Sequence, residues 1–145
     1  MQRSTPWQSY REVATRTATP GYLVLMLYDG VLRFLEQAQD GFALDDPAEY
    51  HQTISNNVIR AQSILDELNR NLDMAAGGEF SIRLRQLYEY LERRLMESNL
   101  RKQADGIQET IVRITVIRDA WKEMLQSDGG QGSPSLAFLS GGALA

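Results

Sequence analysis

"TPGYLVLMLYDGVLRFLEQ", residues 19–37, is the stretch that decides the fold. Thr19 can serve as a helix N-cap and Pro20 suits the first helical position, so the stretch predicts the start of a helix. With residues placed about 100° apart, the polar ones fall within roughly a third of the circumference. They are Asp29, Arg33, Glu36, Gln37 and, just beyond the quoted stretch, Asp40. The apolar remainder is wider than one helix–helix interface needs, so this helix requires further cover from the chain or from a partner.

Composition and charge limit the class of protein. The chain has 145 residues and a formal net charge of −4 from 19 acidic and 15 basic side chains, which argues against a nucleic-acid partner. It has no cysteine, so disulfides and thiol catalysis are excluded. Residues 1–8 lack the apolar core of a signal peptide, and the apolar run 22–27 is far shorter than the roughly 20 residues of a membrane span. We expect a soluble, cytoplasmic protein without membrane insertion.

Three breaks divide the sequence into four helical stretches. Gly41 is expected to end the first helix in a left-handed conformation. Asp46 and Pro47 supply the N-cap and first turn of the second helix. The segment "AAGGE" (75–79) separates it from a third helix, expected over about residues 79–96, and "SNLRKQADG" (98–106) precedes a fourth that runs to about residue 126.

These four stretches predict an all-α fold, an antiparallel up-down four-helix bundle. The bundle is expected over residues 19–126. An N-terminal arm (1–18) precedes it, and a disordered, flexible tail rich in Gly and Ser (127–145) follows it.

Apolar residues that repeat on one face of each helix define the expected core. Those expected to face inward are Leu27, Phe34, Ile54, Leu65, Leu84, Leu91, Ile114 and Trp121, with Phe80 and Leu87 on the same stripe of the third helix. Further apolar residues fall outside these stripes: Ile59, Ile82, Met96, Leu100, Val112 and Val116. Isolated exposed aliphatics are normal, and the arm is one candidate cover. Surplus apolar surface on all four helices also indicates a binding partner.

The sequence holds no recognisable catalytic or cofactor motif. His51 is the only histidine, so the paired Glu-x-x-His metal sites of helical bundles cannot be built. No glycine-rich phosphate-binding pattern is present. Arg93, Arg94, Arg101 and Lys102 are interpreted as a solvated basic face, and Trp121 as packing. We therefore expect no enzyme activity and no cofactor.

Five stretches, in order and with matching spacing over residues 9–125, resemble the flagellar secretion chaperone family. They are "SYREV" (9–13), "TATPGYLVLMLYDGVLRFL" (17–35), "NVIRAQSILDELNRNLD" (57–73), "LYEYLERRLMESNLRK" (87–102) and "IRDAWKEML" (117–125). The first matches the family's tyrosine-bearing arm and the last its D-A-W-K ending. Ser98 departs from the family pattern, which usually has Ala there, and Gln103 stands where Asp is common.

This resemblance implies an export chaperone that binds the disordered C-terminal segment of flagellin. The chaperone prevents premature polymerisation and aids delivery to the flagellar type III export apparatus; an export-gate component as a second partner is left open. The residues expected to contact the client are Tyr10, Val13, Leu25, Ile59, Val112 and Val116. The arm tyrosine, Tyr10, is expected to cover part of the site in the free protein. The alternatives are a homodimeric structural bundle and, disfavoured by the missing chemistry, a bundle enzyme.

Overall fold

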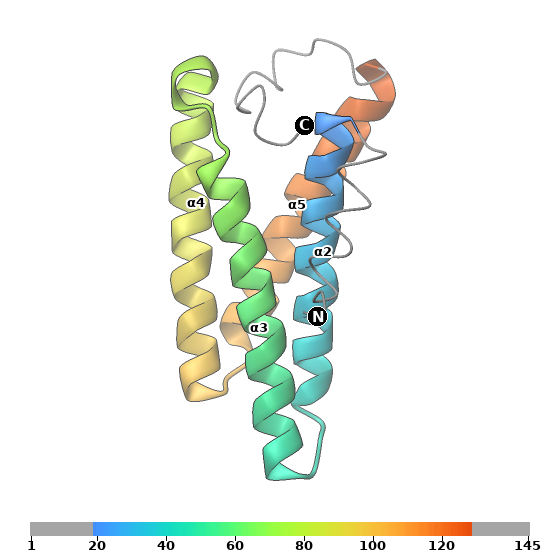
Figure 1. Ribbon diagram of the computed structural model, residues 1–145, viewed down its shortest axis with the longest axis vertical. Coiled ribbons are helices and arrows are strands. Elements are labelled where there is room, and N and C mark those ends of the chain that lie inside the picture. Colours follow the sequence, from blue (N-terminus) through green and yellow to red (C-terminus); the bar gives the residue numbers. More distant parts are fainter. Residues whose placement is uncertain (1–18, 129–145) are drawn as a thin grey trace, which may run out of the picture.

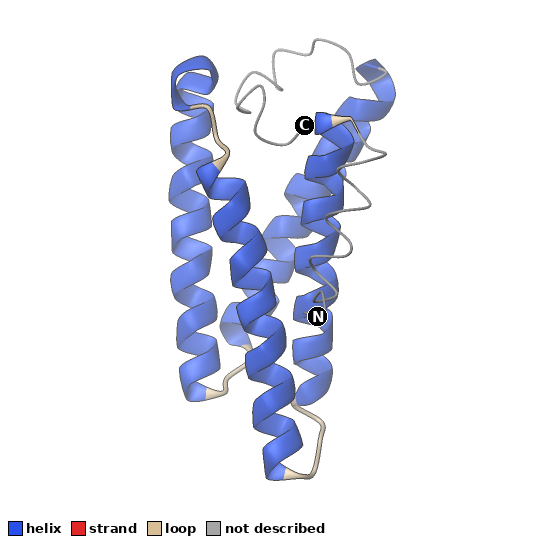
Figure 2. Ribbon diagram, in the orientation of Figure 1, coloured by secondary structure: helices blue, strands red, loops and turns tan. Residues whose placement is uncertain are grey.

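The computed structural model describes residues 19–128, which form four helices. α2 spans Pro20–Gly41, α3 Pro47–Arg70, α4 Met74–Arg101 and α5 Asp105–Asp128. α2 packs against α3 and α5, and α4 packs against the same two helices from the other side, which closes the bundle (Figure 1). Successive helices run in opposite directions and are joined by short loops (Figure 2). The predicted fold class is therefore confirmed.

The predicted N-caps of the first two helices are also confirmed. The Thr19 hydroxyl accepts a hydrogen bond from the Tyr22 backbone N–H at 3.4 Å, and the Asp46 carboxylate accepts one from the Glu49 N–H at 3.0 Å. Each bond satisfies a backbone donor that the first helical turn leaves without a partner.

Gly41 has a different role from the one predicted. Its backbone is not left-handed; among the described glycines only Gly78 has a positive φ. A Cβ at Gly41 would lie 3.0 Å from both Ile54 Cγ1 and Thr53 Cγ2, closer than ordinary contact. The missing side chain therefore lets α3 approach the end of α2.

The predicted limits of the third helix were too narrow. The Asp73 carboxylate caps a first turn that begins at Met74, and Gly78, with φ 55°, then interrupts the helix inside the predicted break. At the other end α4 runs to Arg101, five residues past the predicted 96, and stops where Lys102 adopts a left-handed conformation with φ 52°. The Lys102 ammonium donates to the carbonyl and side-chain oxygens of Asn99, both at 2.6 Å, which holds this cap in place.

The core follows the predicted stripes with one clear error. All eight residues expected to face inward are buried: Leu27, Phe34, Ile54, Leu65, Leu84, Leu91, Ile114 and Trp121. Phe80 was placed among them but is 56% exposed. The buried face of α4 is centred on Leu84, Leu91 and Tyr88 and includes Ser81, so Phe80 lies at its margin, near the end of the bundle.

α2 is the most enclosed of the helices, as its composition requires. It is buried from Gly21 to Gly41 over a broad arc, while Arg33, Glu36 and Gln37 remain exposed. Two polar bonds lock it to α5: the Trp121 indole N–H donates to the Gly21 carbonyl at 2.8 Å, and Arg118 donates to Asp29 at 2.7 Å.

Candidate functional site: two grooves beside α4

A groove of about 670 Å³ lies between α4 and α5. Its apolar lining consists of Leu87, Val112, Val116 and Ile117. Val112 and Val116 are 63% and 65% exposed, although both are branched aliphatic residues in the middle of a helix. Because they are four residues apart, they lie on the same face of α5 and form a short apolar ridge along the groove.

A charged cluster forms the polar wall of this α4–α5 groove. Glu109 accepts hydrogen bonds from Arg94 at 2.9 Å, from the Tyr90 hydroxyl at 2.8 Å and from Arg113 at 3.0 Å. The Arg94 bond, followed by the Tyr90 bond, lowers the pKa of Glu109 to about 2. The bond to Glu109 in turn raises the pKa of Tyr90. The cluster ties α4 to α5, and the charge of Glu109 needs no partner outside the cluster to neutralise it.

The junction of α4 and α5 fixes the end of the same groove. The buried Ser98 hydroxyl accepts a hydrogen bond from the Gly106 backbone N–H at 2.8 Å. A Cβ at Gly106 would lie only 2.4 Å from the Arg94 carbonyl oxygen. Ser98 is the position where this sequence departs from the family's usual Ala, and here its hydroxyl satisfies the first turn of α5.

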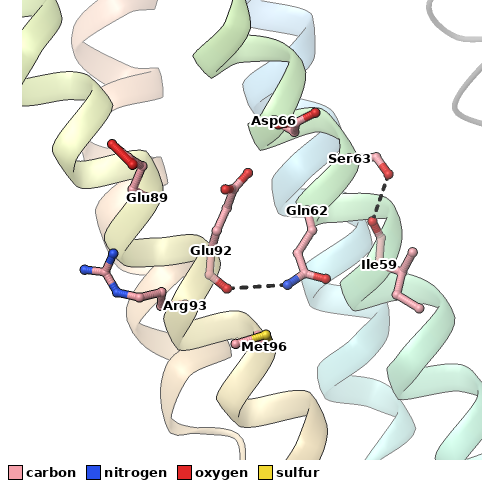
Figure 3. A pocket seen from close by; sticks show the side chains of 8 residues that line it. All are labelled: Ile59, Gln62, Ser63, Asp66, Glu89, Glu92, Arg93 and Met96. Carbon is pink, nitrogen blue, oxygen red and sulfur yellow. Dashed lines mark hydrogen bonds between the residues drawn. The ribbon is translucent and has the colours of Figure 1, made fainter.

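A second groove, of about 610 Å³, lies between α3 and α4. Ile59 on α3 and Met96 on α4 are its apolar members, and each is 53% exposed. The other lining residues are polar or charged: Gln62, Ser63, Asp66, Glu89, Glu92 and Arg93 (Figure 3). The two grooves are similar in size, so their chemistry rather than their volume distinguishes them.

The structure describes four of the six predicted client-binding residues, and these four lie in three different places. Val112 and Val116 lie together in the α4–α5 groove, whereas Ile59 lies in the α3–α4 groove. Leu25 is buried on α2, with 9% of its surface exposed, and lines neither groove. Tyr10 and Val13 lie outside the described residues. The role of all six in binding remains a prediction.

Three apolar residues of the grooves were not among the predicted contacts. Leu87 was expected on the core stripe of the third helix, but it is only half-buried, as is Ile117, because both lie at the edge of the buried face of their helix. Met96 was placed off the core but not at a site. All three lie at the border of an apolar stripe, where one helix meets its neighbour. That position in the sequence pattern could have identified them as groove residues.

The described residues were also compared with the requirements of a metal site and of a membrane-spanning helix. Within residues 19–128 no group of three or more His, Cys, Asp or Glu side chains could hold a metal ion. His51 is exposed and stacks edge-on against Tyr50, with ring centroids 5.1 Å apart. No helix in this part of the chain is long and apolar enough to cross a membrane.

The fold and its surface thus define a four-helix bundle with two open, partly apolar grooves on either side of α4. The sequence model described as flagellar protein FliS matches residues 3–128, and the chain belongs to this family. It is similar to the flagellar secretion chaperone FliS of Bacillus subtilis, with 35% identity over 88% of this chain and 92% of that protein. The FliS chaperones of Salmonella typhimurium and Escherichia coli K12 are each 34% identical. Those two alignments cover 78% and 80% of this chain, and 82% and 83% of the respective proteins.

Proposed function

We propose that this protein is a cytoplasmic, non-enzymatic export chaperone that binds the disordered C-terminal segment of flagellin. By covering that segment it prevents premature polymerisation, and it delivers the subunit to the flagellar type III export apparatus. Membership of the FliS family supports the chaperone class, and the relatives are named flagellar secretion chaperones.

The observation that carries the proposal is the exposed ridge of Val112 and Val116 over the α4–α5 groove. Two neighbouring aliphatic side chains that are each more than half exposed gain free energy when a partner removes them from water. A groove between two helices suits the apolar face of an amphipathic helix. Leu87 and Ile117 supply apolar contacts beneath that helix. A disordered client that becomes helical there must offset its ordering entropy with a broad contact.

The test is a titration of the full-length protein with the C-terminal segment of flagellin from the same organism, followed by far-UV circular dichroism and calorimetry. We expect binding with a gain of helical signal above the sum of the two components. The absence of both heat and helical gain would remove flagellin as the client.

A homodimer formed across the same valines is the competing interpretation. Size-exclusion chromatography with light scattering distinguishes the two. We expect a monomer without client and a one-to-one complex with it, whereas an obligate dimer has twice the monomer mass before any peptide is added.

A further inference from the structure

The α3–α4 groove differs from the α4–α5 groove in its charge. Three of its lining residues are carboxylates, Asp66 on α3 and Glu89 and Glu92 on α4, and Arg93 is its one cation. Asp66 pairs with Arg70 at 3.1 Å, between two exposed side chains. Neither Glu89 nor Glu92 forms an ion pair with any residue that the structure describes. In the α4–α5 groove, by contrast, Glu109 is bonded to two arginines.

Among these carboxylates, the side chain of Glu92 faces the groove most directly, whereas Glu89 points away from α3 at its rim (Figure 3). In Figure 3 the Glu92 side chain points into the space between α3 and α4, whereas Arg93 points away from α3. Gln62 reaches across from α3 and donates to the Glu92 backbone carbonyl at 3.4 Å. Ile59 and Met96 flank the carboxylates, so apolar and acidic surface lie next to each other.

Glu92 is strained electrostatically in the free protein. Burial, followed by the nearby charges of Asp66 and Glu89, raises the pKa of its carboxyl above the ordinary value. A cation brought into the groove reverses this effect, because it stabilises the ionised carboxylates that now repel one another.

We propose that the α3–α4 groove binds a stretch of the client that forms a basic amphipathic helix, with its apolar face on Ile59 and Met96 and a Lys or Arg against Glu89 and Glu92. This inference rests on the proposed function, since it assigns a chemistry to one part of the same client. The acidic groove accepts the basic stretch, and the more apolar α4–α5 groove, in which arginines neutralise Glu109, accepts an apolar one. The two grooves thereby fix which part of the client lies on which side of α4.

The experiment compares two double variants that change the net charge equally. E89K/E92K reverses the charge in the groove, and E36K/E123K reverses two exposed carboxylates on α2 and α5 that line neither groove. Each is titrated with the same flagellin segment at about 0.05 M and about 0.5 M NaCl. We expect E89K/E92K to weaken binding by about threefold to thirtyfold at low salt, with a smaller loss at high salt. E36K/E123K should bind like the wild type.

A second probe identifies the charged partner on the client. In a flagellin segment whose Lys and Arg residues are replaced by Gln, E89K/E92K should lose its disadvantage. The neutral variant E89Q/E92Q keeps the side-chain shape and replaces E89K/E92K in the experiment if the latter does not fold. It should also lose affinity for the segment, but less than E89K/E92K.

A stability measurement separates a binding role from a structural one. Because its pKa is raised in the fold, ionised Glu92 destabilises the protein above about pH 4.5, the ordinary value, and not below it. We therefore expect Glu92→Gln to raise Tm at pH 7 while it weakens binding. Wild-type affinity in E89K/E92K, an equal loss in E36K/E123K, or a lower Tm in Glu92→Gln would each overturn the proposal. If the wild type binds the segment while these variants fail the test, the chaperone function stands and only the basic-helix assignment is lost.

Discussion

The hydroxyl groups of Tyr28 and Tyr88 lie 2.6 Å apart in the buried centre of the bundle and join α2 to α4 across its diagonal. Both side chains are almost completely buried, with 0% and 1% exposure. The hydrogen bond between the two hydroxyls therefore offsets the free-energy cost of removing both groups from water.

The two hydroxyls of this pair should be energetically coupled. Tyr28→Phe or Tyr88→Phe leaves a buried hydroxyl without its partner, so we expect each to lower the free energy of unfolding by about 1–3 kcal/mol. The double variant Y28F/Y88F should lose less than the sum of the two, because no polar group is left behind. Urea unfolding followed by tryptophan fluorescence measures all three variants. Strictly additive losses would show that the two hydroxyls are not energetically coupled.

The same pair makes the protein sensitive to alkali. Burial raises the pKa of Tyr28 from 10.0 to about 12, partly offset by the bond to Tyr88, and the pKa of Tyr88 is also raised well above 10.0. The fold thus favours the neutral phenols. Their contribution to stability is present below about pH 10 and is lost as the pH rises toward about 12. Thermal melts across this window should show a steeper fall in Tm for the wild type than for Y28F/Y88F.

Gly106 should tolerate no side chain. Alanine there places a Cβ 2.4 Å from the Arg94 carbonyl, which is backbone and cannot rotate away. We expect Gly106→Ala to lower the free energy of unfolding by roughly 1–3 kcal/mol, the usual cost of overpacking. Gly77→Ala, at a partly exposed position in the first turn of α4, is the control in denaturant titrations. Equal stability of the two variants would contradict the close approach of α4 and α5.

Val116→Asp should separate binding from folding. The valine is 65% exposed, so a carboxylate at this position meets water and the bundle should keep its stability to within about 0.5 kcal/mol. Binding of the flagellin segment should weaken by about 1–3 kcal/mol, as for a moderate hot spot. If calorimetry shows that the affinity is unchanged, the ridge of Val112 and Val116 is not part of the client site.

Deleting residues 1–15 tests the arm that the sequence predicts. If Tyr10 and Val13 cover part of the client site, their removal should strengthen intrinsic affinity, at least about threefold, because the client no longer displaces them. If the arm also contacts the bound client, its deletion should instead weaken affinity. Identical affinity of the shortened and complete proteins, both folded by circular dichroism, would assign the arm no role in binding.

The sequence predicts the elements of this fold better than their junctions. Apolar periodicity identifies all eight inward residues because each occupies the middle of a stripe, where packing from both sides is assured. The same periodicity wrongly predicts that Phe80 is buried, because the spacing of apolar residues on one helix does not show where the neighbouring helix ends. At Gly41 and Gly106 an added Cβ would lie 3.0 Å and 2.4 Å from atoms of other helices, and such close approaches leave no local signal in the sequence.

The residues of the candidate site can be predicted from the sequence only in part. Exposed apolar residues such as Val112 and Ile59 can be predicted from their position on a helix, but not the grooves to which they belong. Nor does the sequence reveal that Glu109 is neutralised by arginines while Glu92 is not, because those pairings depend on how α4 packs between α3 and α5.

The bond between Trp121 and Gly21 has a consequence for how the chain is made. It joins residues 100 positions apart, and the Arg118–Asp29 pair joins residues 89 apart, so the first helix finds its last neighbour only when α5 has been synthesised. Until then the most apolar helix of the protein lacks part of its cover on the ribosome. The bundle therefore closes only after α5 has been translated, and a chain that stops before residue 121 exposes the apolar surface that this protein buries most completely.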